Sequence, residues 1–123
     1  MIALLLAAAS FFSFQTPSHN IACVGDAHYI RCDTRYATKY SQPKYKPRGC
    51  DLDWGPLSMG PRGKAGVICA GDTALDPAST VLAYGERTRQ GSIVCESAQA
   101  GVTCTNEASG HGFFLSRESW HTF

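Results

Sequence analysis

Residues 91–117 read GSIVCESAQAGVTCTNEASGHGFFLSR, and this stretch decides the fold. Two short runs in it, Ile93-Val94-Cys95 and Val102-Thr103-Cys104, are rich in β-branched residues and are typical of strands. If they pair antiparallel with the two cysteines opposite each other, a two-residue turn falls on Gln99-Ala100. A cross-strand cysteine pair at a non-hydrogen-bonded position has the spacing that a disulfide needs. The stretch therefore predicts a β-hairpin closed by a disulfide.

The same pattern occurs near the start of the chain, where Ile21-Ala22-Cys23 is followed at equal spacing by Ile30-Arg31-Cys32. Folding of these runs onto each other puts a turn on Ala27-His28. Two such hairpins leave Cys50 and Cys69 as the third pair, so the sequence favours disulfides 23–32, 50–69 and 95–104. An exchange of partners between the two hairpins stays open.

The six cysteines of this 123-residue chain indicate its compartment. The sequence contains no CxxC, and no cysteine–histidine spacing is typical of zinc, so we expect disulfides and an oxidising compartment. We expect no metal and no cofactor. The formal net charge is +1, which argues against an obligatory polyanion partner for the whole chain and against nucleic acid.

Residues 2–14 are almost wholly apolar but are too few for a transmembrane helix. Ala7-x-Ala9 resembles a signal-peptidase site, so we expect residues 1–13 to form a signal segment, cut after Ala9 or nearer to Phe14. Residues 14–123 are then a single disulfide-rich β domain. The alternative is a buried first strand made of the phenylalanines Phe11, Phe12 and Phe14.

Short apolar runs alternate with glycine, proline and polar residues along the rest of the chain. Residues 65–70 and 80–84 have strand composition, and the 12 glycines favour many turns. This predicts an all-β fold, a compact disulfide-stapled sandwich or small barrel of roughly six to eight short antiparallel strands.

A basic segment, residues 34–49, carries five cations and three tyrosines and no acid. Positive charge interleaved with aromatic rings can hold an anionic polymer. The alternative is a solvated connection whose tyrosines pack on the sheet. The candidate ligand-binding residues are Arg35, Lys39, Tyr40, Lys44, Tyr45, Lys46 and Arg48.

His111 lies between two glycines and is the best catalytic candidate, with Ser116 and Asp72 as partners of a relay. The sequence has no nucleophile elbow and does not show that these residues meet. The alternative is structural: His111 ties a loop to the backbone, and Arg117 pairs with an acid such as Asp72. The sequence favours the structural role.

Several motifs together resemble an uncharacterised family of small, secreted, cysteine-rich bacterial proteins, a domain of unknown function with a GVTCxN…GHGFxLSR tail. The resemblance implies a secreted domain and transfers no catalytic residue. The motifs are Pro17-Ser18-x-Asn20-Ile21-x-Cys23, Arg31-Cys32-Asp33, Cys69-x-Gly71-Asp72, Tyr84-Gly85, Gly101-Val102-Thr103-Cys104-x-Asn106 and Gly110-His111-Gly112-Phe113-x-Leu115-Ser116-Arg117.

We therefore expect a secreted or periplasmic binding module whose partner is an envelope polymer or a secreted protein. An inhibitor of a wall hydrolase is one form of it, by analogy of class. The loops at residues 60–63 and 110–112 could then enter a partner's cleft. The alternatives are a small hydrolase that uses His111 and a polyanion binder that uses residues 35–48.

Overall fold

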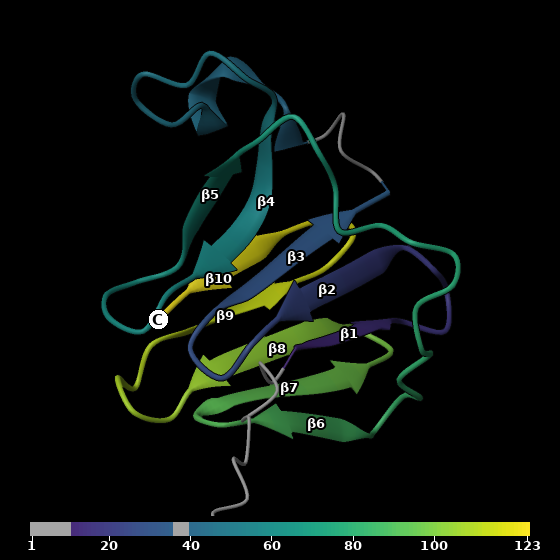
Figure 1. Cartoon of the computed structure of the whole chain (residues 1–123). Coiled ribbons are helices and arrows are strands. Elements are labelled where there is room, and N and C mark those ends of the chain that lie inside the picture. Colours follow the sequence, from purple (N-terminus) through teal and green to yellow (C-terminus); the bar gives the residue numbers. More distant parts are fainter. Residues whose placement is uncertain (1–10, 36–39) are drawn as a thin grey trace, which may run out of the picture.

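A computed structural model describes residues 11–35 and 40–123 (Figure 1). These residues form two five-stranded antiparallel sheets, each a simple meander. The first sheet, purple to teal in Figure 1, contains β1 (Phe12–Gln15), β2 (Ile21–Gly25), β3 (Ile30–Thr34), β4 (Trp54–Met59) and β5 (Gly66–Cys69). The second, green to yellow, contains β6 (Arg87–Gln90), β7 (Ile93–Ala98), β8 (Gly101–Asn106), β9 (Gly112–Leu115) and β10 (Trp120–Thr122). One 3₁₀ turn, η1 (Pro43–Tyr45), lies in the β3–β4 connection.

The predicted disulfide-closed hairpins are confirmed. Cys95 pairs with Cys104, and Ala98 pairs with Gly101, which leaves Gln99 and Ala100 as the turn. The Cα atoms of Cys95 and Cys104 are 4.1 Å apart, close to the spacing of a non-hydrogen-bonded pair.

The other two disulfides, Cys23–Cys32 and Cys50–Cys69, are also as predicted. No partners are exchanged between the hairpins. The first hairpin turns on Ala27 and His28, because Asp26 N donates to Tyr29 O at 2.9 Å.

The two sheets repeat one another in register as well as in strand order. In each sheet the second cysteine of the hairpin pairs with a large apolar residue on the next strand, and so does the apolar residue two positions before that cysteine. The equivalent pairs are Cys32–Leu57 with Cys104–Phe113, and Ile30–Met59 with Val102–Leu115.

The inward faces of the two sheets share one core, which makes the fold a sandwich. The four hairpin cysteines are fully buried there. The Sγ atoms of Cys23, Cys32 and Cys104 lie within 4.8 Å of one another, so the cystine of one sheet packs against the cystine of the other. These sulfurs are all disulfide-bonded and are therefore not free to bind a metal.

The strands of the structure differ from the sequence-based expectation near the start of the chain and at residues 80–84. The predicted signal segment, residues 1–13, overlaps β1, in which Phe14 is 2% exposed and Phe12 packs against the core. Of the three rings in the alternative, Phe14 is buried, Phe12 is half-buried and Phe11 is 70% exposed, and the signal segment itself stays a prediction. Residues 80–84 form no strand; they contribute only a bridge between Gln15 and Val81.

One end of the sandwich is closed by contacts between the two sheets; we call it the closed end. Asn106, which is fully buried, donates from Nδ2 to Gly60 O at 3.3 Å and to Pro61 O at 3.4 Å. Gly91, with φ of 55°, lies so near Ala27 that an added Cβ would stand 2.7 Å from the Ala27 methyl. Only glycine fits this approach.

Candidate functional site

The three candidate catalytic residues lie in different places. His111 directly precedes β9 and Ser116 directly follows it, so the strand separates them by about 16 Å. Their hydrogen bonds also go elsewhere. The ring Nδ1 of His111 lies 3.2 Å from Phe123 O, and Ser116 Oγ donates to Ser119 O at 3.0 Å. The placement gives His111 and Ser116 roles in fixing backbone at opposite ends of β9.

Asp72 belongs to an ion-pair cluster on the outer face of the first sheet. Arg31 Nε contacts Asp33 Oδ2 at 2.9 Å, and Arg31 Nη1 contacts Asp72 Oδ1 at 2.8 Å. Asp33 also accepts a hydrogen bond from Ala74 N at 2.8 Å. The partner of Asp72 is thus Arg31, whereas the sequence suggested Arg117, which lies 3.7 Å from Glu118.

The pKa values of the two carboxyl groups in this cluster are shifted in opposite directions. Burial raises the pKa of Asp33 above its usual value, although the bonds from Ala74 and Arg31 oppose the change. The hydrogen bond from Arg31, together with its charge, lowers the pKa of exposed Asp72. The cluster attaches residues 72–74 to β3.

A groove of about 390 Å³ adjoins this cluster. Its polar groups are largely used by the fold: Asp33 and Asp72 bind Arg31, and Trp54 Nε1 donates to Gln42 O at 3.1 Å. Its rim also includes Arg35, which borders the residues outside the described ranges. The groove is therefore a weaker candidate than its size suggests.

In the basic segment, the two described tyrosines pack against other residues, whereas the described cations are exposed. Tyr40 is 2% exposed and its hydroxyl donates to Ser116 O at 2.9 Å, while burial raises its pKa to about 12. Tyr45 packs between Tyr40 and Trp120. Neither ring is therefore presented as an open stacking surface, in keeping with the alternative that these tyrosines pack on the sheet.

The cations of this segment lie outside the core. Arg35, Lys44, Lys46 and Arg48 are exposed, and Lys39 lies outside the described residues. Lys44 Nζ stands 5.1 Å from the centre of the Tyr45 ring, and Lys46 Nζ 5.7 Å from that of Trp54. Binding of a polyanion here stays a prediction.

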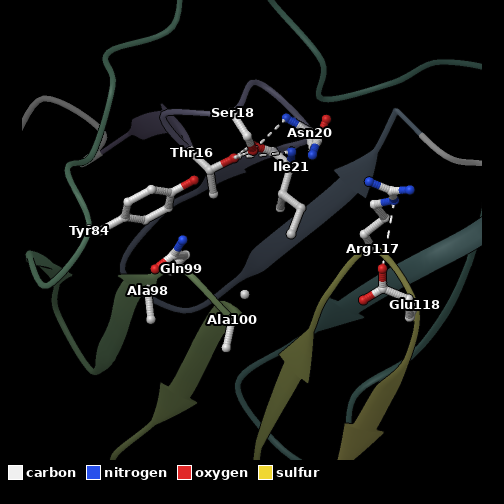
Figure 2. A pocket seen from close by; sticks show the side chains of 11 residues that line it. Thr16, Ser18, Asn20, Ile21, Tyr84, Ala98, Gln99, Ala100, Arg117 and Glu118 are labelled. Carbon is white, nitrogen blue, oxygen red and sulfur yellow. Dashed lines mark hydrogen bonds and ion pairs between the residues drawn. The ribbon is translucent and has the colours of Figure 1, made fainter.

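The end of the sandwich opposite the closed end has a cleft of about 240 Å³, which we call the end cleft. Its walls are the β1–β2 loop, the β5–β6 connection, the β7–β8 turn and the β9–β10 turn, so they come from both sheets. Figure 2 shows Tyr84 and Gln99 on one side, Ser18 and Asn20 above, and Arg117 with Glu118 on the other side. Ile21 lies between them.

The β1–β2 loop is held rigidly by its own hydrogen bonds. Thr16 N donates to Ile21 O at 2.9 Å, and Asn20 N donates to Ser18 Oγ at 3.3 Å. His19 has a positive φ of 62°, unusual for a residue with a side chain, and its Nδ1 lies 2.7 Å from Gln15 Oε1. A backbone strain that surrounding bonds maintain is typical of functional loops.

The backbone that follows Tyr84 is also held by hydrogen bonds. Gly85 N donates to Ser97 O at 2.7 Å, and Ser97 N donates to Glu86 O at 3.0 Å, so the backbone after Tyr84 is bonded to the end of β7. The ring itself remains 44% exposed. Tyr84 is therefore an aromatic side chain presented to solvent on a rigid support.

The sequence reasoning missed the end cleft as a site. Six of its residues nevertheless belong to the motifs that carry the family resemblance, and these motifs are far apart in the chain. The sequence signal for this site is that residues of separate motifs meet in one cleft. That meeting can be recognised only when the arrangement of the strands is known. The six are Ser18, Asn20, Ile21, Tyr84, Gly101 and Arg117.

The fold and the site define a class: a disulfide-bonded β-sandwich of two equivalent meanders with a polar cleft at one end. The chain belongs to a family of unknown function, DUF6636, whose model matches residues 1–123. No curated protein and no solved structure matches it. Three disulfides indicate folding in an oxidising compartment outside the cytoplasm. Among the described residues, no helix has the length and apolar character needed to cross a membrane.

Proposed function

We propose that this protein is a bacterial binding module, secreted or periplasmic, that holds a component of the cell envelope in its end cleft. The observation that carries the proposal is the convergence of Asn20, Tyr84 and Gln99, from three separate segments, on one cleft (Figure 2). Within the described part of the chain, their side-chain polar groups make no hydrogen bond, so they are available to a ligand.

The disulfides support the same proposal through stability. Two of them cross-link the hairpins in the core and the third closes the β3–β5 region, so the loops stand on a covalently fixed scaffold. Preformed sites lose less conformational entropy on binding. Such a module needs no catalytic group, and none is assigned to it.

The test is co-sedimentation of the purified, oxidised protein with washed bacterial envelope fragments. Tyr84→Ala combined with Gln99→Ala should release the protein into the supernatant. Tyr29→Ala is the matched control, because Tyr29 is 38% exposed and lies at the closed end. No sedimentation of the wild-type chain, or equal sedimentation of all variants, would contradict the proposal.

A further inference from the structure

The charge of the end cleft restricts its ligand. Arg117 and Glu118 are its only charged side chains among the lining residues, and they lie 3.7 Å apart with opposite signs. A site for a phosphate or sulfate polymer carries an excess of cations. The balance here favours an uncharged ligand.

The hydrogen-bonding groups suggest a ligand rich in hydroxyl groups. The amides of Asn20 and Gln99 each carry a donor and an acceptor, whereas the Ser18 hydroxyl is already bonded within the loop to Thr16 Oγ1 at 3.1 Å and to Asn20 N at 3.3 Å. Such a mixed set, all at the rim of one cleft, matches neighbouring hydroxyls that also donate and accept.

The Tyr84 ring supplies the remaining element of this recognition. Its exposed face can cover the apolar C–H side of a sugar ring, while its hydroxyl points toward Thr16 in the cleft (Figure 2). One aromatic face with a few oriented polar groups is the usual make-up of a small-molecule site.

The size of the cleft sets how much of the ligand it can hold. Its volume of about 240 Å³ is below the roughly 300 Å³ at which pockets for drug-sized ligands begin. It therefore suits one ring-sized group, with the rest of a polymer outside.

The two ends of the sandwich can be compared with each other, because the two sheets repeat the same strand order and register. At the closed end the equivalent position lies between the β2–β3 and β6–β7 turns. There Ser92 N and Oγ both reach Ala27 O, at 3.4 and 3.3 Å, and Gly91 packs on Ala27. The sandwich is thus sealed at the closed end. At the opposite end it has an open cleft that is lined with hydrogen-bonding side chains.

From these observations we infer that the end cleft binds a single uncharged pyranose unit of an envelope polysaccharide, with Tyr84 on its C–H face and Asn20 and Gln99 on its hydroxyls. This inference rests on the proposed function and names the ligand class of the same site.

The experiment is a titration of the full oxidised protein with neutral cello-, chito- and manno-oligosaccharides, followed by ¹H–¹⁵N chemical shifts. At least one sugar should shift the amides of residues 16–21 and 98–101. Tyr84→Ala should weaken its binding about tenfold or more, as loss of an aromatic anchor does, and Gln99→Ala should also weaken it. Tyr29→Ala should not change the Kd. An approximately tenfold rise in sodium chloride should also leave it unchanged, because no counterions are released.

Three outcomes would overturn the inference. If no sugar shifts the cleft while envelope sedimentation still depends on Tyr84, the ligand is not a neutral sugar, although the proposed function stands. If dextran sulfate binds instead, in a salt-sensitive way that Lys44→Ala with Lys46→Ala abolishes, the basic segment is the binding surface. If the wild-type protein neither binds a sugar nor sediments with envelope fragments, the proposed function is contradicted as well.

Discussion

Cys32 and Cys104 have Sγ atoms within 4.8 Å of each other, although they belong to different sheets and to different disulfides. Each disulfide therefore forms part of the other's packing environment. Replacing one of them changes the cavity that surrounds the second. The two cystines are thus in packing contact without being covalently linked, and we expect their contributions to stability to be coupled.

The first prediction concerns this coupling. Changing either hairpin pair to alanine should lower the free energy of unfolding by about 2–4 kcal/mol. Removing both should cost at least about 0.5 kcal/mol less than the sum, because the sheets can close over one shared cavity. The free energy of unfolding of the wild type, of each single-pair variant and of the variant lacking both pairs is measured by urea unfolding. Trimethylamine oxide is added because it keeps weakened variants folded.

The matched control is the third pair, Cys50→Ala with Cys69→Ala, which lies outside the core cluster. Its cost should add to that of either hairpin pair within about 0.5 kcal/mol. Strict additivity of the two hairpin pairs would show that the cystine contact carries no energy.

The second prediction concerns Arg31. Arg31→Met leaves the Asp33 carboxylate buried without its charged partner and should cost roughly 2–4 kcal/mol near neutral pH. Asp33 already has a raised pKa, and the variant should raise it further. A raised folded-state pKa gives stability that is present below the unfolded-state pKa and lost as the pH rises through the folded value. The loss in Tm should thus be smaller at about pH 4 than at about pH 7.

Adding Asp33→Asn to Arg31→Met removes the uncompensated charge and should restore part of the stability near neutral pH. An equal loss at both pH values, with no rescue by the second change, would mean that the cluster acts through packing alone.

The third prediction separates a structural His111 from a catalytic one. His111→Ala removes one partly exposed contact with Phe123 O and should lower the free energy of unfolding by about 1 kcal/mol or less. Envelope sedimentation should be unchanged, since His111 lies at the closed end. Asn106→Ala at the same end should cost more, about 1–3 kcal/mol, because a fully buried amide and its bonded carbonyls lose their partners. A hydrolytic activity that His111→Ala abolishes at unchanged Tm would refute the structural reading.

The fourth prediction concerns the start of the folded chain. A variant that begins at Phe11 keeps the whole of β1 and is the reference for this test. One that begins at Gln15 loses Phe14, which is 2% exposed, and should be destabilised by more than about 3 kcal/mol. If a leader is removed in the cell, mass spectrometry should find Phe12 retained. A stable, folded chain beginning at Gln15 would contradict this.

The disulfide-closed hairpins could be predicted because their signal is local. Ile93, Cys95, Val102 and Cys104 alternate with polar residues, and the spacing alone sets the turn. Strand β6 could not be predicted, since Arg87-Thr88-Arg89-Gln90 has no apolar pattern. Its strand conformation comes from pairing with β7, and its charges suit an edge that must not pair further.

The candidate site was less predictable than the fold for a related reason. His111 stood out because glycines flank it, yet those glycines serve the backbone: Gly112 pairs with Phe123 in both directions. Tyr84 and Asn20 carried no local sign of function. They become neighbours only because the β1–β2 loop and the β5–β6 connection, which are far apart in the sequence, line the same cleft.

The likeness of the two meanders has a consequence for the origin of the molecule. A single meander with one cystine on its apolar face could bury that face against a second copy, as in a two-fold homodimer. The present chain has the form of such a dimer fused through residues 70–86. In a true homodimer both ends would be identical by symmetry. Fusion removes that constraint, so one end could become sealed around Gly91 and Asn106 while the other diverged into a cleft.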